Sequence, residues 1–409
     1  MQLRGIDAET LDRMDDRRGD TSREEFVRRA LKSVLFPHQP QDELPFGAEP
    51  STVYGSLPFT FIDLFAGIGG FRCALTAIGG RCVYTSELDR FAVKTYRHWY
   101  GDTGVDESDF TKADPTAIPN HDVLAAGFPC QPFSLAGVSK RRSQGRPSGL
   151  QDTKWVELYD ALCTAIETKK PPVLFLENVK NLVSHDRGAT WEKIESDLES
   201  LGYHIFHEVL DARWWVPQHR ERLYILGFNK KTFGADKDAI PFEFPAPPRE
   251  RATLGDILDP DPDRKYMLST ALWRYLKKYK AKHEAAGNGF GFGIADPNGV
   301  SRTLSARYHK DGSEILVKQA GWPRPRRLTP REAALLQGFD DRYAAIYGHS
   351  DGFPQVVSDT QAYRQFGNAV SPRVVEAIAR QLLPIMSQAV YQSGTRTLLG
   401  KRPFRREAA

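Results

Sequence analysis

One cysteine of this 409-residue sequence is well placed for covalent chemistry. Cys130 stands in the segment Gly127-Phe128-Pro129-Cys130-Gln131-Pro132-Phe133-Ser134. A thiolate is a strong nucleophile, and flanking prolines stiffen the backbone that would aim it at a target atom. The alternative is that Cys130 is a small buried hydrophobic residue, which is the usual role of a lone cysteine. The groups that accompany it along the chain favour the nucleophile.

A short apolar run places this cysteine at the edge of a sheet. Residues 122–126, Asp-Val-Leu-Ala-Ala, have the length and composition of a buried strand in a parallel sheet. Pro129 and Pro132 cannot continue a ladder of strand hydrogen bonds, so the strand must end near Gly127. Open α/β sheets bind their ligands at the carboxyl ends of the strands, and we expect Cys130 there.

A strand, a glycine turn and a helix predict a nucleotide-binding unit nearer the N-terminus. The strand 59–65 runs into Ala-Gly-Ile-Gly-Gly at 66–70, and a helix is expected over 71–78. Glycines allow the backbone to approach a ligand closely. The spacing differs from the Gly-x-Gly-x-x-Gly of dinucleotide enzymes, because Phe71 and Arg72 follow the last glycine directly.

Acidic and aromatic residues downstream complete the expected nucleotide pocket. A second strand, 81–86, ends at Glu87, about twenty residues after the turn begins, where a carboxylate can accept both ribose hydroxyls. Asp109 and Phe110 supply a polar and an aromatic group for an adenine ring. Each feature alone is compatible with a solvated turn, but the three in register favour a pocket.

Further polar groups follow Cys130. The loop 139–149 is basic and rich in glycine and serine; a solvated loop is the plain interpretation, and a mobile lid that binds phosphates is favoured by its position. The apolar strand 173–176 ends at Glu177, which either caps the next helix or is an acid with a raised pKa. Alternation puts Gln218, Arg220 and Arg222 on one face of an extended segment. Solvated surface ion pairs are the commoner role of arginines, but two guanidiniums on one face suit anionic or carbonyl oxygen partners.

The chain changes character between residues 229 and 326. The stretch is rich in proline, in basic and aromatic residues over 273–282, and in glycine over 287–293, which suits a nucleic acid and predicts an inserted domain. After it, a helix is expected over 328–339, with Thr329 as its N-cap and Pro330 at its first position. A last helix is expected to run through residue 383.

Composition favours an ordinary globular protein. The net charge is +4, no apolar run approaches the ~20 residues that span a bilayer, and the polar N-terminus is unlike a signal peptide. The four cysteines have neither a Cys-x-x-Cys pair nor zinc-like spacing, which predicts free thiols, no metal site and a cytoplasmic location. Residues 1–20 are expected to be poorly ordered, 22–35 to form an amphipathic helix that packs on the main body or binds a partner, and 37–55 to be a linker.

In this order the motifs resemble those of the DNA (cytosine-5) methyltransferases over nearly all of residues 59–383. Each segment alone is weak, but the ordered set is specific: Phe65-Ala66-Gly67-Ile68-Gly69-Gly70, Pro129-Cys130-Gln131, Glu177-Asn178-Val179, Gln218-x-Arg220-x-Arg222, Arg327-Leu328-Thr329-Pro330-Arg331-Glu332 and Gly367-Asn368-Ala369-Val370. Within the family, 132–140 and 288–316 are similar to the bacterial type II, Dcm-like branch, which methylates the inner cytosine of CCWGG and has relatives acting on CCGG-like sites. One departure is Trp-Val-Glu-Leu-Tyr at 155–159, which keeps the leucine of a Gly-Thr-Leu-Phe-like run but replaces its Gly-Thr pair.

The resemblance implies a Rossmann-like, S-adenosylmethionine-dependent methyltransferase fold of the α/β class, with a mixed, mostly parallel sheet and a smaller inserted target-recognition domain. The implied boundaries are an N-terminal extension (1–58), the catalytic domain (59–228), the target-recognition domain (229–326), a segment that completes the catalytic domain (327–390) and a basic tail (391–409). The implied partners are double-stranded DNA and a cognate restriction endonuclease, with the enzyme itself a monomer.

The resemblance also implies the roles of individual residues. The implied catalytic residues are Cys130, Glu177, Arg220 and Arg222. S-adenosylmethionine would contact Phe65, Gly67, Ile68, Gly69, Gly70, Glu87, Leu88, Asp109, Phe110, Pro129, Leu158, Asn368 and Ala369. DNA would be contacted by Gln131, Ser134, Lys140, Arg141, Arg142, Arg302, Arg307 and Tyr308.

Three alternatives stay open. An RNA methyltransferase of the same family is disfavoured by the large insertion. A catalytically dead DNA-binding protein on this scaffold would be expected to lack Cys130 or Glu177, and both are present. A nicotinamide-dependent oxidoreductase is disfavoured by the glycine spacing and by the Pro-Cys-Gln segment.

Overall fold

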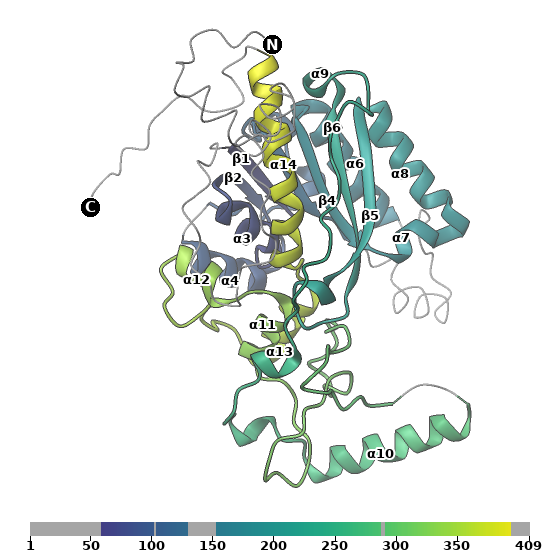
Figure 1. Cartoon of the computed structure of the whole chain (residues 1–409), viewed down its shortest axis with the longest axis vertical. Helices are drawn as coiled ribbons and strands as arrows, with labels where there is room; N and C mark the ends of the chain where they lie inside the picture. The colour runs from purple at the N-terminus through teal and green to yellow at the C-terminus, as the bar shows by residue number, and fades with distance from the viewer. Residues whose placement is uncertain (1–58, 102–103, 130–152, 288–290, 394–409) are drawn as a thin grey trace, which may run out of the picture. The chain divides into compact units, whose positions relative to one another are not determined.

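A six-stranded sheet forms the centre of the protein (Figure 1). The computed structural model describes residues 59–101, 104–129, 153–287 and 291–393. The strand order is β2-β1-β3-β4-β6-β5. β6 runs opposite to the other five strands, which all run in one direction, so the expected mixed, mostly parallel sheet is confirmed. The strands are β1 (Phe59–Leu64), β2 (Gly80–Ser86), β3 (Val123–Gly127), β4 (Val173–Val179), β5 (Tyr203–Asp211) and β6 (Glu221–Asn229).

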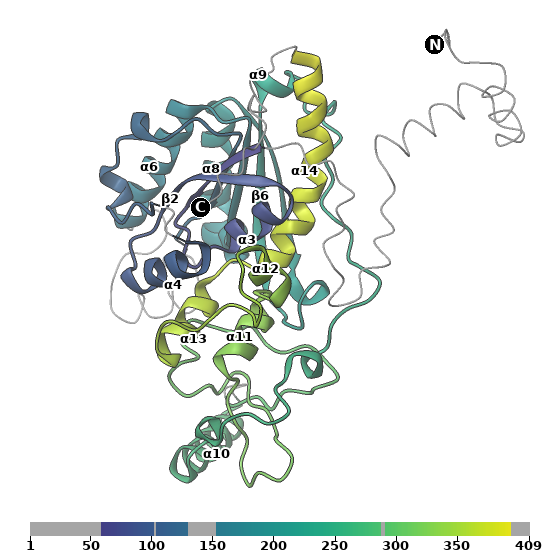
Figure 2. The ribbon, with the colours of Figure 1, turned by 90° about the vertical axis from the view of Figure 1, so that its left-hand side faces the viewer.

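Helices connect these strands and cover both faces of the sheet (Figures 1 and 2). Beside them are 3-10 turns at 110–112, 115–117, 185–188, 212–214, 254–257 and 264–266. The α-helices are α3 (Gly70–Ala77), α4 (Arg90–Tyr100), α6 (Thr153–Lys169), α7 (Asn181–Ser184), α8 (Ala189–Ser200), α9 (Lys230–Phe233), α10 (Thr270–Ala285), α11 (Pro330–Gln337), α12 (Asp341–Ile346), α13 (Asp359–Asn368) and α14 (Pro372–Ser393). None of these helices is long and apolar enough to cross a membrane.

The first strand shows why the sheet needs a layer of helices on each face. Its side chains alternate, so Phe59 and Phe61 join the cluster that contains α3 and α14, while Ile62 and Leu64 join the cluster that contains α6 and α8. Both sets are buried. A strand that is apolar on both faces is stable only between two layers, and this sequence supplies them.

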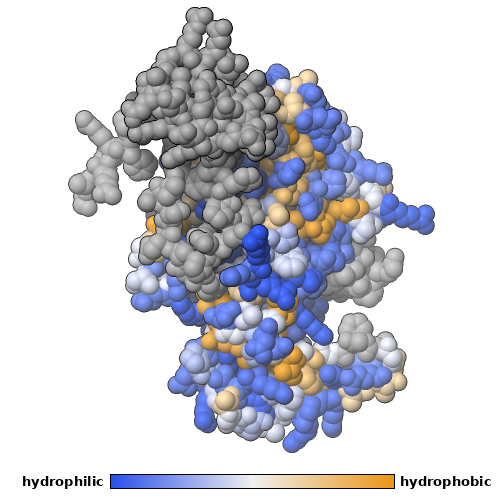
Figure 3. All heavy atoms as spheres, in the orientation of Figure 1, coloured by the Kyte–Doolittle hydropathy of each residue, from blue (hydrophilic) through white to orange (hydrophobic). Residues whose placement is uncertain are grey.

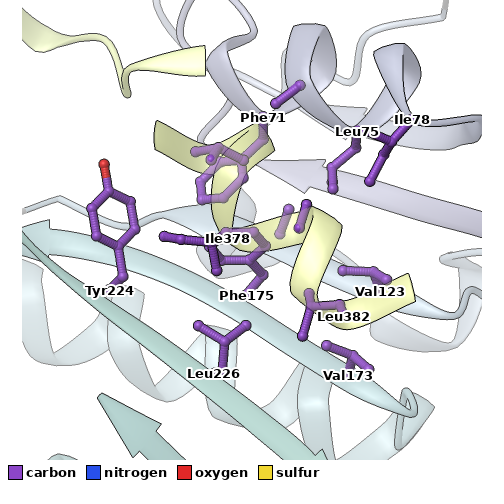
Figure 4. Close-up of a cluster of buried hydrophobic side chains, with 14 of the residues drawn as sticks. Phe71, Leu75, Ile78, Val123, Val173, Phe175, Tyr224, Leu226, Ile378 and Leu382 are labelled. Carbon is purple, nitrogen blue, oxygen red and sulfur yellow. The ribbon is translucent and has the colours of Figure 1, made fainter. Parts of the chain in front are cut away.

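The α3 and α14 face joins the two ends of the described chain. Figure 4 shows Phe71 of α3 and Ile378 and Leu382 of α14 directed at the strand residues Val123 and Phe175. The rings of Phe71 and Phe175 meet edge to face with their centroids 5.1 Å apart. The last helix in the sequence therefore packs against strands that come from its first half.

The stretch 229–326 contributes to this packing at several points. Ile240 and Phe242 lie in the cluster under β6 and α14. Leu304 and Tyr308 lie in a separate cluster with α4, α11 and α13. The described part of the stretch has one helix of more than four residues, α10, and the predicted domain boundaries at 229 and 326 remain predictions.

A buried ion pair between Arg326 and Glu332 joins the end of the stretch 229–326 to α11. Glu332 accepts hydrogen bonds from Arg326 Nη1 and Nη2 at 2.8 and 2.7 Å, and from the backbone N–H groups of Thr329 and Asp259 at 2.6 and 2.8 Å. Both side chains of the pair are excluded from solvent. Thr329 is the N-cap and Pro330 the first residue of α11, as the sequence predicts.

Several sequence predictions concern residues outside the described ranges. These are the poorly ordered start, the helix over 22–35, the linker over 37–55, the basic lid over 139–149 and all but the first three residues of the tail over 391–409, which belong to α14. They remain predictions.

Candidate active site

The glycine turn after β1 has the backbone conformation that the sequence predicts. Gly67 and Gly69 have φ angles of 57° and 79°, and Gly69 is the N-cap of α3. Phe65 also has a positive φ, 55°, which is strained for a bulky residue and marks a functional position. The turn lies at the carboxyl end of β1, where α/β sheets bind their ligands.

A tyrosine that sequence reasoning missed supports this turn from beneath. The Tyr100 hydroxyl lies 2.7 Å from the carbonyl oxygen of Ile68 and 3.1 Å from that of Gly69. A Cβ added at Gly69 would lie 2.5 Å from the Tyr100 ring, so only glycine fits there. Holding the carbonyls inward leaves the other side of the turn to face a ligand.

Glu87 lies against the same turn, as predicted. Its Oε2 accepts the Gly67 N–H at 2.7 Å, and its Oε1 accepts the Asp89 N–H at 2.7 Å. Burial raises the pKa of Glu87, while these backbone hydrogen bonds favour the charged form. A carboxylate has about four acceptor sites, so Glu87 keeps capacity for hydroxyl donors.

Apolar groups border the turn on both sides. The ring of Phe65 meets the buried ring of Phe110 edge to face at 5.3 Å. Leu88, next to Glu87, is 65% exposed and is accessible to a ligand. Asp109 is the N-cap of the turn that contains Phe110, and Leu158 is half-buried on α6.

The backbone that leads to Cys130 is held from two directions. Asn178 Nδ2 of β4 donates to the Phe128 carbonyl at 3.2 Å, and Trp155 Nε1 of α6 donates to the Pro129 carbonyl at 2.9 Å. Trp155 directly precedes Val156 and Glu157, the two residues that replace the Gly-Thr pair of the family pattern. Cys130, Gln131, Ser134, Lys140, Arg141 and Arg142 lie outside the described residues.

Glu177 lies within β4 and not after its end, which corrects the prediction. β6 pairs with β4 as far as Val179, and this pairing extends the strand through Glu177. Glu177 is therefore no helix cap. It stands beside Gly127 of β3 in the register of the sheet.

The Glu177 carboxyl is buried and paired with an arginine. Its Oε1 lies 3.1 Å from Arg222 Nε, and their side chains are 11% and 18% exposed. Burial raises the pKa of Glu177, against the charges of Arg222 and Arg220. Among the described residues its ion-pair partner is Arg222, and a carboxylate has about four acceptor sites.

Arg220 is buried and donates hydrogen bonds to three backbone carbonyl oxygens. Its guanidinium donates to Leu304 at 3.3 Å, to Gly367 at 3.2 Å and to Ala369 at 2.9 Å. Gln218 has a similar role: it donates to the Leu336 carbonyl and accepts the Leu304 N–H. The predicted catalytic role of Arg220 stays a prediction, because Cys130 lies outside the described residues.

The segment after α13 closes the site from the far end of the sequence. A Cβ added at Gly70 would lie 2.3 Å from the Val370 carbonyl oxygen, and one added at Gly127 would lie 3.0 Å from Val370 Cγ2. Ala369 is buried, whereas Asn368 is exposed. The structure thus brings the glycine turn, the end of β3 and the predicted cofactor residues 368–369 together.

Three of the residues predicted to contact DNA lie in the described chain; the side chains of two are exposed to solvent and that of the third is buried. Arg302 and Arg307 are exposed. Tyr308 is fully buried, with its hydroxyl donating to the Ile315 carbonyl at 2.7 Å and accepting the Leu328 N–H at 2.8 Å. Tyr308 is a core residue, and that prediction is wrong for its side chain.

The fold belongs to a known class. It is similar to the solved structure of the Entamoeba histolytica methyltransferase EhMeth, with a TM-score of 0.61 at 19% identity, over 80% of this chain and 98% of that one. The architecture is the α/β fold of S-adenosylmethionine-dependent methyltransferases, as predicted. The class is thereby fixed.

The sequence fixes the family within this class. The profile of the C-5 cytosine-specific DNA methylases matches residues 59–384. The chain is 43% identical over 394 residues to the DNA-cytosine methyltransferase of Escherichia coli K12, covering 84% of this chain and 81% of that protein. It is 44% identical over 333 residues to the type II methyltransferase M.NlaX of Neisseria lactamica, covering 80% and 97%. The chain belongs to the C-5 cytosine-specific DNA methylase family and is a DNA (cytosine-5-)-methyltransferase (EC 2.1.1.37), which confirms the resemblance seen in the sequence.

Proposed function

We propose that this enzyme methylates carbon 5 of a cytosine flipped out of a short, specific duplex site, and that this site is CCGG- or CCWGG-like. The observation that carries the proposal is the buried Glu177–Arg222 pair, whose Oε1 and Nε atoms are 3.1 Å apart. Glu177 lies in the carboxyl-terminal half of β4, beside Gly127 at the end of β3. Cys130 follows Gly127 closely in the sequence. A base must leave the duplex stack to reach such a buried pair.

Cys130 is the proposed nucleophile. Its thiolate forms a bond to carbon 6 of the cytosine, and the ring electrons move toward N3 and O2. Carbon 5 thereby becomes an enamine-like nucleophile that bonds to the methyl group. The bond from that methyl group to the sulfonium of S-adenosylmethionine would break and leave a neutral thioether. Loss of the carbon 5 proton to solvent then expels the thiolate, which restores the aromatic ring and frees Cys130.

Glu177 and Arg222 are the proposed electrostatic partners of this ring. The raised pKa of Glu177 favours a carboxyl that shares a proton with N3 and accepts from the exocyclic amine. Arg222 would hold the ring carbonyl oxygen, where negative charge develops. Arg220 holds the backbone segments around them. Its proposed catalytic role is to favour the thiolate form of Cys130.

The glycine turn fits S-adenosylmethionine, which supplies an electrophilic methyl group on a sulfonium. The turn gives backbone in the left-handed region, Glu87 keeps acceptor capacity for ribose hydroxyls, and exposed Leu88 offers an apolar surface for adenine. We assign the contacts to Phe65, Gly67, Ile68, Gly69, Gly70, Glu87, Leu88, Asp109, Phe110, Pro129, Leu158, Asn368 and Ala369.

Duplex DNA is the proposed substrate, held by the lid over 139–149 and by the stretch 229–326 as the target-recognition domain. Exposed Arg302 and Arg307 support this assignment, and Gln131, Ser134, Lys140, Arg141 and Arg142 are assigned from the sequence alone. We further propose a cytoplasmic monomer that protects DNA from a cognate restriction endonuclease.

One experiment tests reaction, substrate and site together. The protein is expressed in a host without cytosine methylation, and the plasmid is bisulfite-sequenced. The expected result is protection of one cytosine in CCGG- or CCWGG-like sites; another unique motif would overturn only the site. Unprotected DNA, from folded protein that binds S-adenosylmethionine, would favour the RNA alternative.

The matched variant is Cys130→Ser. It should abolish methylation and leave S-adenosylmethionine affinity within about twofold, because the hydroxyl cannot replace a thiolate as nucleophile. Calorimetric titration with the cofactor measures the second quantity. Near-normal turnover of this variant would remove Cys130 from its role.

A further inference from the structure

Helix α10 carries a charge that the proposed catalytic site does not use. Its sixteen residues contain one carboxylate, Glu284, and five cations: Arg274, Lys277, Lys278, Lys280 and Lys282. The resulting formal charge of +4 equals that of the whole chain, so the remaining residues are neutral on balance. Positive charge concentrated on one helix attracts a polyanion.

The helix is attached to the protein along one narrow side. Leu276 is its buried residue, packed with Leu268 and Leu316 and flanked by Leu272 and Trp273. In both ribbon views no other labelled helix or strand lies along α10 (Figures 1 and 2). Hydrophilic residues predominate over the lower part of the space-filling view, where α10 lies (Figure 3).

Three of the cations form a row opposite this attachment. Arg274, Lys278 and Lys282 recur every fourth residue, so they share one face of the helix. At 3.6 residues per turn, the middle of this row points away from Leu276. All three are exposed, and none forms an ion pair with a described residue; Glu284 lies 3.8 Å from Lys280 instead.

The surroundings of the row suit close approach of a nucleic acid backbone. Ala271, Ala281 and Ala285 are exposed on the same side and leave no bulky group in front of the helix. Tyr275 and Tyr279, 57% and 38% exposed, stand beside the row with their rings stacked at 6.0 Å, and their hydroxyls can donate to phosphate oxygens. The helix is about 24 Å long, which matches about seven steps of duplex DNA.

We propose that α10 binds the sugar–phosphate backbone of duplex DNA through Arg274, Lys278 and Lys282, beside the segment that contains the target base. This inference rests on the proposed function, because that function makes duplex DNA the substrate. Contacts to phosphates carry no sequence information directly. The helix therefore raises affinity and sets the position of the protein on the duplex without selecting the site.

The test compares two triple variants that lose the same charge. One is Arg274→Gln/Lys278→Gln/Lys282→Gln; the control, Lys193→Gln/Lys231→Gln/Lys237→Gln, changes exposed lysines away from α10. Fluorescence anisotropy with a duplex carrying the mapped site, at several salt concentrations, gives the affinity and its salt dependence. Cofactor affinity and the melting temperature verify that each variant is folded.

We expect the α10 variant to bind duplex DNA roughly 10-fold more weakly or worse at low salt. The slope of log K against log salt should decrease in magnitude by about 2.7, at about 0.9 per lost phosphate contact. The ratio of cognate to non-cognate affinity and the turnover at saturating DNA should stay within twofold. The control and the charge-conserving variant Arg274→Lys/Lys278→Arg/Lys282→Arg should bind like the wild type.

Two outcomes would overturn the inference. A wild-type salt slope in the folded α10 variant would show that the helix makes no phosphate contact, and a selective loss of cognate affinity would show that it reads bases. The failure of the proposed function has a different signature, because the wild-type protein itself would then neither bind nor methylate the duplex.

Discussion

Two buried glutamates, Glu332 in the scaffold and Glu177 in the candidate active site, differ in how fully their carboxyl groups are hydrogen-bonded. Glu332 accepts four hydrogen bonds, two of them from Arg326, and so fills the acceptor capacity of a carboxylate. Glu177 is also largely buried but forms one ion pair within the described chain, with Arg222, and burial raises its pKa. A fully bonded carboxyl fixes a chain segment, whereas a partly bonded one keeps groups for a substrate.

The same substitution should therefore lower the catalytic rate at Glu177 and the stability at Glu332. The larger effect is expected on the catalytic rate. Glu177→Gln should lower the rate of methyl transfer about 10²- to 10⁴-fold, because the amide cannot share a proton with N3. Its free energy of unfolding should stay within about 1 kcal/mol of wild type, since the lost ion pair and the relieved burial of charge oppose each other. Single-turnover assays at saturating DNA and urea unfolding measure the two quantities.

The second prediction concerns the scaffold. Glu332→Gln turns an amide N–H₂ toward Arg326 and toward backbone N–H donors, and leaves a buried arginine uncompensated. Breaking such a pair costs about 3–5 kcal/mol of unfolding free energy. Activity per folded molecule should remain near wild type, which active-site titration can show. If Glu332→Gln instead lost turnover without losing stability, the two glutamates would not differ as proposed.

A third and smaller effect should appear in the pH dependence of stability. Asp63 of β1 is fully buried, and burial raises its pKa well above its usual value of 3.8 against the charge of Arg72. Because the folded pKa is raised, the stabilisation from the protonated carboxyl is complete below the unfolded value. It is lost as pH rises through the folded pKa.

The variant Asp63→Asn removes this titration. Between pH 4 and the folded pKa, wild-type stability should fall with rising pH by up to about 1.4 kcal/mol per unit more than that of Asp63→Asn. Urea unfolding of both proteins at a series of pH values provides the comparison. Parallel pH curves for the two proteins would contradict the assignment.

Local sequence was sufficient for elements whose signals are contiguous. The strand, turn and helix near residue 65 and the Thr329 cap lie where expected, because hydrophobic alternation, glycine and capping act over a few residues. Glu177 was placed after its strand because the β4–β6 pairing that extends the strand joins distant segments. Such pairing leaves no local signal.

Burial was the second quantity that the sequence could not supply. Tyr308 lies in a basic and aromatic segment that suggests DNA, but its hydroxyl holds core backbone. Tyr100 belongs to none of the sequence motifs, and only its contacts with the glycine turn reveal its role. The residue type alone does not distinguish an aromatic side chain in the core from one on a binding surface.

The packing of α14 and Val370 against the first strands also bears on biosynthesis. The ribosome completes β1, α3 and β3 long before α14, so an emerging chain must keep one apolar face of its sheet uncovered until the last helix arrives. Until then Gly70 and Gly127 also lack the neighbour that closes the pocket. We therefore expect a nascent chain that lacks α14 to be prone to aggregation and to acquire methylating activity only once α14 has been synthesised.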